Sequence, residues 1–345
     1  INLLEPCGQF GTRLMGGKDA ASSRYIFTRL SSVATRMYDQ RDNSTLTYLE
    51  DDGKPIEPEY YMPVLPMILV NGAEGIGTGY STQVPCYNPA DIKANINAVI
   101  AGESMKPMTP WYKGFTGTVY KKSDTTWVMG GTFKEAANGT ITITELPPGK
   151  WTQDYKEFLD VQVEKGKIKY YDNHSTEDHP KFTIHGFTGN DPRKDLGLTK
   201  NINTGNMWLM TPTGMKKYAT AEAIIADYVG YRVKHYKQRK INMLKDFKAQ
   251  AAVASNKARF VRMVVNGDFI VFKRKRVDID KDLLNHKFQK YQGNYEYLMN
   301  IKTSQYTEES ISRLNAEESE KKSQVTELEK LSFKDLWVND LKNIK

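Results

Sequence analysis

The 345-residue sequence contains little cysteine and no long apolar segment, and these two absences exclude several classes of protein. Only Cys7 and Cys86 occur, with no CxxC pair and no Cys/His group at zinc-binding spacing. This usage fits a reducing compartment and argues against a disulfide scaffold or a structural zinc site. No apolar run approaches the roughly 20 residues that a membrane span requires, and no signal peptide is recognisable. We therefore expect no membrane partner.

Histidine is also scarce, and the candidate metal and nucleotide motifs are weak. His174, His179 and His185 fall within twelve residues but form no helical i, i+4 ligand pair, so we interpret them as loop and strand-edge residues. The aspartates of DIDKD, residues 278–282, have no partner carboxylate in a convincing strand and indicate a solvated loop. The glycines of residues 72–79 lack the lysine of a phosphate-binding loop. The sequence therefore predicts no metal site within this segment.

The sequence is basic overall, and its positive charge is concentrated in one part of the chain. The formal net charge is +8. Residues 215–276 contain 16 lysines and arginines against 4 acidic residues, whereas residues 277–345 contain 11 against 13. A basic segment of this kind suits a polyanionic partner, but a solvated helix face has the same composition. Charge alone leaves both interpretations open.

The length allows two or three domains, and the hydrophobic pattern indicates an α+β fold class. The chain starts at Ile1 in the middle of a pattern, so we expect a segment of a longer polypeptide, and any targeting signal would lie outside it. A helix or turn is expected near Ala20–Leu30, and a short buried strand after Pro66. Asn88 followed by Pro89 predicts a helix start. Alternating runs predict strands at 117–120, 126–129 and 140–144, a helix over 151–163, and the end of this α+β module near residue 212.

A long basic helix is predicted for residues 218–265, which contain no proline and a single glycine. Apolar residues recur there with helical spacing from Ile224 to Tyr236. A helix of this length needs a partner to cover its apolar face. Residues 308–344 form a second periodic stretch, so we expect a long antiparallel coiled coil, with residues 266–306 as a compact helical cap.

A glycine-rich segment near the start carries the candidate chemistry. Residues 8–30, GQFGTRLMGGKDAASSRYIFTRL, contain one arginine–tyrosine pair, Arg24 and Tyr25. A tyrosine hydroxyl becomes a useful nucleophile toward phosphate only beside cations, and Arg24 is adjacent while Arg13 and Lys18 share the loop. A core tyrosine beside a surface arginine is the commoner meaning of this dipeptide. The pair alone therefore does not distinguish a catalytic tyrosine from a structural one.

A second glycine-rich segment, GAEGIGTG, occupies residues 72–79. It is typical of a tight turn. Glycines also let a backbone ribbon approach DNA closely, and Ile76 would then act as an apolar wedge between base pairs.

Taken together, these segments resemble the DNA breakage-and-reunion region of type II DNA topoisomerases, particularly the eukaryotic and large-virus kind. The active-site segment of that family is similar to GQFGTRLMGGKDAASSRYIFTRL. A second hallmark is similar to EPEYYMPVLPMILVNGAEGIGTGYST, and a third to LPPGKWTQDYKEFL. The likeness extends to the closing SFKDLWVNDLKNIK and covers essentially the whole chain.

The resemblance implies roles for single residues. Tyr25 would be the nucleophile that joins a DNA 5′-phosphate, and Arg24 would steady the scissile phosphate. The DNA-binding residues would be Arg13, Lys18, Ser22 and Ile76, with the isoleucine intercalating and bending the duplex.

The resemblance also implies an architecture and partners. Residues 1–85 would be the C-terminal part of a winged-helix domain, residues 86–214 a tower domain, and residues 215–345 a coiled coil with a helical dimer gate. The enzyme would be an ATP-dependent isomerase that makes a transient double-strand break in DNA, as a homodimer with one tyrosine per protomer. Mg²⁺ and ATP would be bound by Toprim and ATPase regions, which this sequence does not contain, in the same chain or in a partner chain.

Two positions depart from the family pattern. Ser23 stands where cellular members usually have proline, and Met15 stands where histidine is common. Phage enzymes that are split into several polypeptides also carry an AASRYIF-like stretch, so a cellular, viral or phage source stays open. We expect the nucleus for a cellular eukaryotic source, the host cell or virion for a viral one, and the infected cytoplasm for a phage.

Two other functions would use some of the same features. A non-catalytic DNA-bending or clamp module would need the basic helix and Ile76, with Tyr25 merely structural. A tyrosine recombinase or relaxase would need its own arginine and histidine set, and no histidine precedes His174. We rank the recombinase or relaxase last.

Overall fold

The computed structural model describes residues 1–344, and the chain forms two compact units. Unit 1 comprises Ile1–Gln40, Tyr61–Arg232 and the residues from Asp340 onward, and unit 2 comprises Arg41–Tyr60 and Val233–Asn339. Helices and strands occur in both units, and the predicted α+β class is confirmed. The predicted division at residues 85 and 214 stays a prediction.

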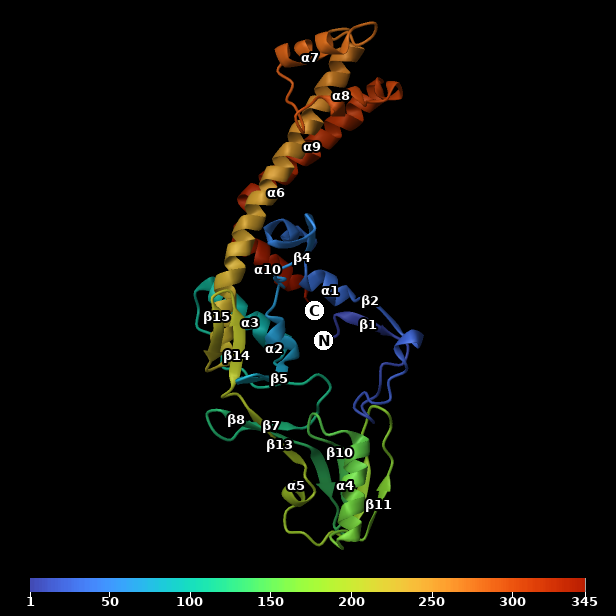
Figure 1. Ribbon diagram of the computed structural model, residues 1–345, viewed down its shortest axis with the longest axis vertical. Coiled ribbons are helices and arrows are strands. Elements are labelled where there is room, and N and C mark those ends of the chain that lie inside the picture. The colour runs from blue at the N-terminus through green and yellow to red at the C-terminus, as the bar shows by residue number, and fades with distance from the viewer. Residues whose placement is uncertain (345) are drawn as a thin grey trace. The chain divides into compact units, whose positions relative to one another are not determined.

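Unit 1 begins with a two-stranded sheet, and the connection between its strands is the first glycine-rich segment (Figure 1). β1 (Leu4–Cys7) pairs antiparallel with β2 (Phe27–Leu30). A short 3-10 helix, η1 (Ser23–Tyr25), comes just before β2. The predicted helix or turn over Ala20–Leu30 is therefore wrong in its second half. The hydrogen bonds that make β2 a strand come from β1, about twenty residues away, and local pattern does not reveal them.

Three helices and a hairpin follow. α1 (Ser32–Met37) and α2 (Met67–Asn71) lead to the hairpin of β5 (Ala73–Gly77) and β6 (Tyr80–Val84), and then to α3 (Pro89–Ala101). The predicted strand after Pro66 is wrong, because the Pro66 carbonyl accepts from the backbone N–H of Leu69 at 2.9 Å and starts α2. The predicted start of α3 is confirmed: the Asn88 side chain accepts from the Ala90 N–H at 2.9 Å.

A four-stranded antiparallel sheet covered by one helix forms the next part of unit 1, which we call the α4 module, residues 132–185. Its strand order is β11 (Tyr170–Asn173), β12 (Phe182–His185), β10 (Ile141–Glu145) and β9 (Thr132–Glu135), and its helix is α4 (Thr152–Glu164). Alternate residues of β10 face inward, and Ile141 and Ile143 pack with Leu159 of α4 and Phe182 of β12. The alternating pattern of this strand and the helix over 151–163 were correctly predicted.

The rest of unit 1 contains a three-stranded sheet, a short helix and a second hairpin. The sheet has the order β13 (Thr199–Asn203), β8 (Thr126–Gly130) and β7 (Thr118–Lys121); α5 spans Pro192–Asp195; and β14 (Met207–Thr211) pairs with β15 (Gly214–Tyr218).

Unit 2 is built on two long helices. α6 (Ala221–Val265) contributes its residues from Val233 onward, and α9 (Glu308–Lys330) runs antiparallel to it (Figure 1). Ala258 and Val261 of α6 pack on Leu314 of α9, while Lys248 pairs with Glu329 at 2.8 Å. The predicted antiparallel helix pair is confirmed within this unit.

A helical cap joins the two long helices, and a hairpin completes unit 2. The remaining elements within unit 2 are α7 (Arg276–Asn285), α8 (Glu296–Met299), η3 (Thr303–Gln305), β3 (Tyr48–Asp51) and β4 (Lys54–Pro58). Two further elements, α10 (Phe333–Asn343) and η2 (Gln40–Thr45), belong to unit 2 except for residues 340–343 and residue 40, which belong to unit 1. The loop predicted for residues 278–282 is wrong, because these residues lie inside α7. Ile279 and Leu283 are buried in the cap core, and Asp280 pairs with Arg276 at 2.9 Å across one turn.

Candidate active site

The connection between β1 and β2 is a closed loop held by its own polar groups; we call residues 8–22 the active-site loop. The Asp19 carboxylate accepts from the Thr12 N–H at 2.9 Å and from the Thr12 hydroxyl at 2.6 Å. The hydroxyl bond is the main reason that the pKa of Asp19 lies below its usual range. The Ala21 N–H donates to the Gln9 carbonyl at 2.9 Å and brings the two ends of the loop together.

Two glycines of this loop are required by close approaches. A methyl group at Gly11 would lie 2.5 Å from the Cα of Gly17. Gly16 has φ +63°, a left-handed conformation, and a methyl group there would lie 2.5 Å from ring atoms of Trp151. Glycine therefore lets this loop fold on itself and lie against the first turn of α4.

Arg24 and Tyr25 lie together on η1, directly after the loop. The Ser22 carbonyl accepts from the Tyr25 N–H at 2.9 Å, so the short helix starts from Ser22, whose side chain makes no capping bond. The Tyr25 side chain is 69% exposed, and the Arg24 guanidinium carbon lies 5.0 Å from the centre of its ring. An exposed phenol beside a guanidinium is the arrangement that a tyrosine nucleophile for phosphate needs.

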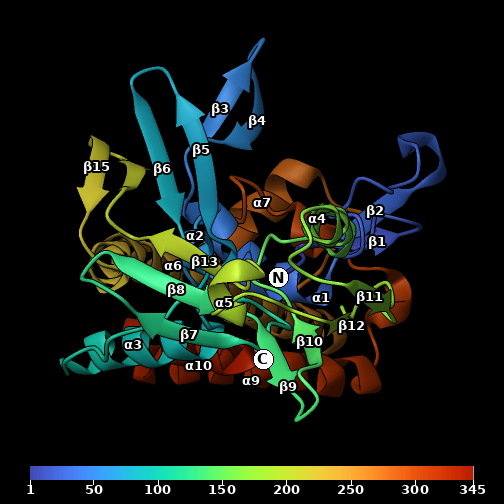
Figure 2. The ribbon, with the colours of Figure 1, turned by 90° about the horizontal axis from the view of Figure 1, so that it is seen from below.

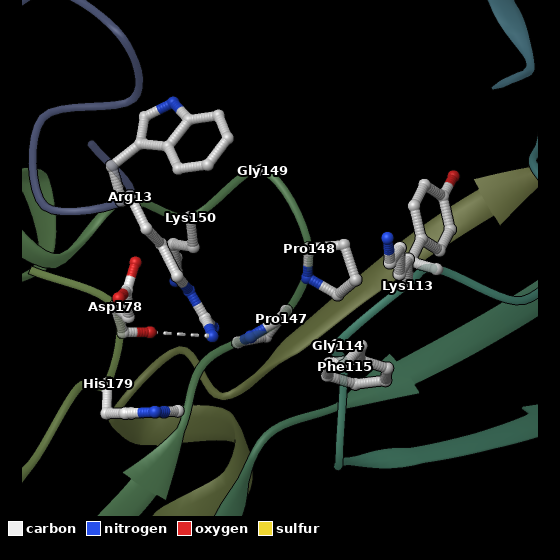
Figure 3. Close-up of a pocket in the computed structure, with 12 residues that line it drawn as sticks. Arg13, Lys113, Gly114, Phe115, Pro147, Pro148, Gly149, Lys150, Asp178 and His179 are labelled. Atoms are coloured by element: carbon white, nitrogen blue, oxygen red, sulfur yellow. Dashed lines mark hydrogen bonds between the residues drawn. The ribbon is translucent and has the colours of Figure 1, made fainter. Parts of the chain in front are cut away.

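The two other cations of the segment turn toward the α4 module. The Arg13 guanidinium forms an ion pair with Glu145. It also donates to the Asp178 carbonyl at 3.4 Å (Figure 3). Lys18 lies 3.5 Å from Asp154, and both of these side chains are largely exposed. Among residues 1–344, no hydrogen bond, ion pair or ring contact joins either cation to Tyr25. Their predicted contacts with DNA, like that of Ser22, stay predictions.

Glu145 is a buried carboxylate at the end of β10, and its side chain is only 4% exposed. Its oxygens accept from the Thr116 N–H at 3.1 Å, the Thr116 hydroxyl at 3.0 Å and the Leu146 N–H at 2.9 Å, in addition to Arg13. Burial alone would raise the pKa of Glu145, but the bonds from Arg13 and Thr116 and the charge of Arg13 together hold it below its usual range.

The second glycine-rich segment is a hairpin that projects from unit 1 (Figure 2). Ile76 is opposite Ser81 near its turn, and the isoleucine side chain is 94% exposed. The neighbouring β14 supports the hairpin: the Thr82 hydroxyl donates to the Trp208 carbonyl at 2.8 Å, and the Asn206 amide donates to the Ser81 carbonyl at 3.0 Å. An apolar side chain held this far out in water is suited to insertion between stacked bases.

Sequence reasoning missed Glu145, although a signal for it exists. In the run ITITE, Ile141 and Ile143 face the core, and the two-residue period places Glu145 on the same face. A charged residue at an inward position of a strand is expected to have a charged or hydrogen-bonding partner. The identity of that partner, 132 residues away in the sequence, is not contained in the local pattern.

The structure adds three observations on metals, thiols and membranes. Among residues 1–344, no group of three or more His, Cys, Asp or Glu side chains is placed to hold a metal ion. The thiols of Cys7 and Cys86 are both free. No helix in the described chain has both the length and the apolar character for crossing a bilayer.

Comparisons with known proteins agree with this geometry. Residues 1–342 match the family described as the A subunit of DNA gyrase/topoisomerase IV. DNA topoisomerase 2 of Arabidopsis thaliana is 36% identical over 402 aligned residues, covering 100% of this chain and 27% of that protein. DNA topoisomerase 2 of Penicillium chrysogenum is 35% identical, covering 99% of this chain and 24% of that protein.

A solved structure is also similar over the full chain. The DNA-binding, cleavage and re-ligation domain of Plasmodium falciparum topoisomerase II matches with a TM-score of 0.91 and 35% identity, covering 100% of this chain and 52% of that one. The fold of this chain is thus similar to that of a solved type II topoisomerase domain. The chain belongs to the family of the DNA gyrase/topoisomerase IV A subunit. It spans about a quarter of the length of the Arabidopsis thaliana and Penicillium chrysogenum topoisomerases.

Proposed function

We propose that this chain is the DNA breakage-and-reunion segment of an ATP-dependent type II DNA topoisomerase, an isomerase that changes DNA supercoiling and catenation. The observation that carries the proposal is the exposed Arg24–Tyr25 pair at the end of the closed loop, with the guanidinium 5.0 Å from the ring centre. The similarity of this chain to the DNA-binding, cleavage and re-ligation domain of Plasmodium falciparum topoisomerase II supports the same assignment.

The proposed reaction is a reversible transesterification. The Tyr25 hydroxyl oxygen attacks a backbone phosphorus, a tyrosine–phosphate ester forms, and the bond from phosphorus to the 3′-oxygen breaks. The phenol proton is lost, and the 3′-oxygen takes up a proton to become a hydroxyl. Because one phosphodiester replaces another, the reverse attack by the 3′-hydroxyl reseals the strand without an external source of energy.

Arg24 would stabilise the charge that develops on the attacked phosphate, because a guanidinium matches two phosphate oxygens at once. Ile76 would insert between base pairs and bend the duplex, and its 94% exposure suits that role. Lys18, with its side chain 68% exposed, and Ser22 would contact the backbone near the break. Arg13 is less available, because its guanidinium already pairs with Glu145.

We propose a homodimer that closes through the helical cap of unit 2, residues 266–306. Val277 and Leu284 are seven residues apart on α7 and are both 64% exposed, and Ile270 and Phe272 nearby are 62% and 64% exposed. Residues seven apart share one face of a helix, so the cap presents an apolar surface. A second copy of the same surface would cover it.

We propose further that Mg²⁺ and ATP are bound by Toprim and ATPase regions outside this sequence, in the same chain or in a partner chain. Among residues 1–344, no three His, Cys, Asp or Glu side chains are grouped so that they could hold a metal ion. In this proposal the activity of the whole enzyme would also need those regions.

The test is covalent trapping of protein on DNA with Tyr25→Phe in the complete enzyme. We expect the wild type to yield denaturant-resistant protein–DNA adducts at DNA 5′-ends and Tyr25→Phe to yield none, while both bind plasmid DNA equally. A matched control is Tyr170→Phe, since Tyr170 is 49% exposed on β11, outside the site. Adducts that persist in Tyr25→Phe would overturn the nucleophile assignment.

The same experiment decides between catalysis and a DNA-bending clamp without chemistry, which the exposure of Ile76 also favours. A clamp would bend DNA in the wild type and in Tyr25→Phe alike, and neither protein would form adducts. That outcome would replace the enzyme proposal with the clamp.

A further inference from the structure

The active-site loop lies next to the α4 module within unit 1 (Figure 1). Several contacts hold it there. The Leu14 N–H donates to the Glu177 carbonyl at 3.1 Å, and the Leu14 carbonyl accepts from the Gln153 N–H at 2.9 Å. Gly16 lies against the Trp151 ring. Neither backbone bond of Leu14 specifies a side chain, so these contacts alone would tolerate many sequences.

One contact of this set is specific and charged, and it is the pair of Arg13 with Glu145. The Glu145 side chain is 4% exposed and that of Arg13 is 27% exposed. Both oxygens of Glu145 are already bound to Thr116 and Leu146, which fixes the carboxylate in one orientation. A buried carboxylate that has lost its cation is strongly unfavourable, so Glu145 holds Arg13 in place.

The Arg13 end of this pair is also restrained. Its guanidinium donates to the Asp178 carbonyl, beside a cavity of about 410 Å³ whose walls include Lys150 and Pro147 (Figure 3). Arg13 belongs to the loop that Asp19 and the Gln9–Ala21 bond close. A displacement of Arg13 is therefore passed through a short, internally bonded segment to η1.

We propose that Glu145 is a positioning residue for DNA cleavage: through Arg13 it holds the active-site loop, and with it Tyr25 and Arg24, in the place where the scissile phosphate arrives. Glu145 does not touch DNA in this proposal. Arg13 acts chiefly as its partner and only secondarily as a backbone ligand. The inference rests on the proposed function, because it concerns the reaction of Tyr25.

The test uses the complete enzyme with Glu145→Gln, Arg13→Gln, the double variant and Arg13→Lys. Each single Gln variant should lower the single-turnover cleavage rate about 10- to 100-fold, the range that small misplacements of reacting groups produce. The double variant should be no slower than the slower single one. Arg13→Lys keeps the charge and should recover part of the rate. Glu135→Gln is the matched control, an exposed glutamate on β9 of the same sheet, and should cleave at the wild-type rate.

Three readouts separate positioning from DNA binding and from a general loss of structure. The DNA dissociation constant and its salt dependence should stay within about twofold of the wild type in Glu145→Gln. Amide hydrogen exchange should accelerate at Leu14 and Gly17 in that variant, while the core strand β12 stays protected. If Glu145→Gln does not fold, the Arg13→Gln and Arg13→Lys pair gives the same comparison.

Cleavage by Glu145→Gln at the wild-type rate, or multiplicative losses in the double variant, would overturn the inference. A fall in the salt slope for Arg13→Gln, with Glu145→Gln fully active, would instead make Arg13 a DNA ligand. Tyr25→Phe distinguishes these failures from failure of the proposed function. If Tyr25→Phe forms no adducts and Glu145→Gln is fully active, only the positioning role is lost.

Discussion

The active-site loop and the β5–β6 hairpin are both rich in glycine, but the surroundings of the glycines differ between the two segments. In the loop, a methyl group at Gly16 would strike the Trp151 ring. In the hairpin, a methyl group at Gly75 would meet nothing within 4 Å. At Gly16 the missing side chain permits a close approach, whereas at Gly75 the space beside the backbone is open.

The same contrast holds for the two side chains to which we propose functions. Tyr25 follows a loop that is bonded internally and to the α4 module, while Ile76 stands 94% exposed near the turn of its hairpin. A nucleophile must be held in one place for in-line attack, and a wedge needs an open surface that DNA can cover. Glycine content alone therefore says little about function, and the surroundings of each glycine say more.

The largest effect is expected from Gly16→Ala. The left-handed backbone and the overlap with Trp151 should together cost about 2–4 kcal/mol of stability in the loop. Thermal unfolding and single-turnover cleavage of the complete enzyme would measure this, and cleavage should fall at least tenfold. Gly75→Ala is the matched control for stability and should change it by less than about 0.5 kcal/mol. Equal losses in the two variants would remove the contrast between loop and hairpin.

Ile76→Ala should come next, with a large effect on DNA shape and little on the protein. The side chain is 94% exposed, so its loss removes almost no core contact. Bending of a fluorescently labelled duplex, measured by energy transfer, should decrease, while Tyr25 keeps its ability to form adducts on DNA that is already bent. Ile76→Met keeps an apolar wedge and should bend DNA nearly normally. An unchanged bend in Ile76→Ala would contradict the wedge.

A smaller effect, on stability, is expected when the pH is lowered. It should act through Glu145, which holds the active-site loop, and not through the hairpin. The folded-state pKa of Glu145 lies below its ordinary value of 4.5, so its stabilising contribution is complete above that pH and is lost as pH falls through the folded pKa. The difference in melting temperature between wild type and Glu145→Gln should therefore be constant from pH 7 to about pH 5 and shrink below about pH 4.5. A difference that grows in acid would contradict the sign of this linkage.

The smallest effect is expected from Lys18→Gln. Its pair with Asp154 is exposed on both sides and contributes little, so stability should change by less than about 0.5 kcal/mol. If Lys18 contacts one DNA phosphate, the slope of the logarithm of the DNA-binding constant against the logarithm of the salt concentration should become about 0.9 less negative in Lys18→Gln. Asp154→Asn is the control and should leave that slope near the wild-type value. An unchanged slope in Lys18→Gln would remove Lys18 from the DNA contacts.

Periodic segments could be predicted from the sequence, and contacts between distant segments could not. The helix predicted for residues 218–265 agrees with α6, because a long stretch without proline and with a single glycine has few other structures open to it. The run after Pro66 was predicted as a strand and is α2, because four consecutive apolar residues show neither a strand period nor a helix period.

For the candidate site, the Arg24–Tyr25 pair could be found from the sequence because the two residues are adjacent. The direction in which Arg13 points could not be found, because its partner Glu145 lies in another segment of the fold. Ion pairs of this kind depend on the tertiary structure, and a single sequence carries no direct record of them.

Arg13 and Arg24 differ in the partner that a DNA phosphate would have to replace at each guanidinium. Within residues 1–344, no carboxylate pairs with Arg24, and its guanidinium rests on the Tyr25 ring. An exposed cation–π contact stabilises by about 0.5–1 kcal/mol, whereas a hydrogen bond to a charged group contributes about 1.5–3 kcal/mol. Replacement of the Tyr25 ring by a DNA phosphate as the partner of Arg24 would thus be favourable. Replacement of Glu145 by a phosphate as the partner of Arg13 would instead leave a buried carboxylate without its cation. The Tyr25 ring thus holds the Arg24 guanidinium in a weak contact that the phosphate of the proposed DNA substrate could replace.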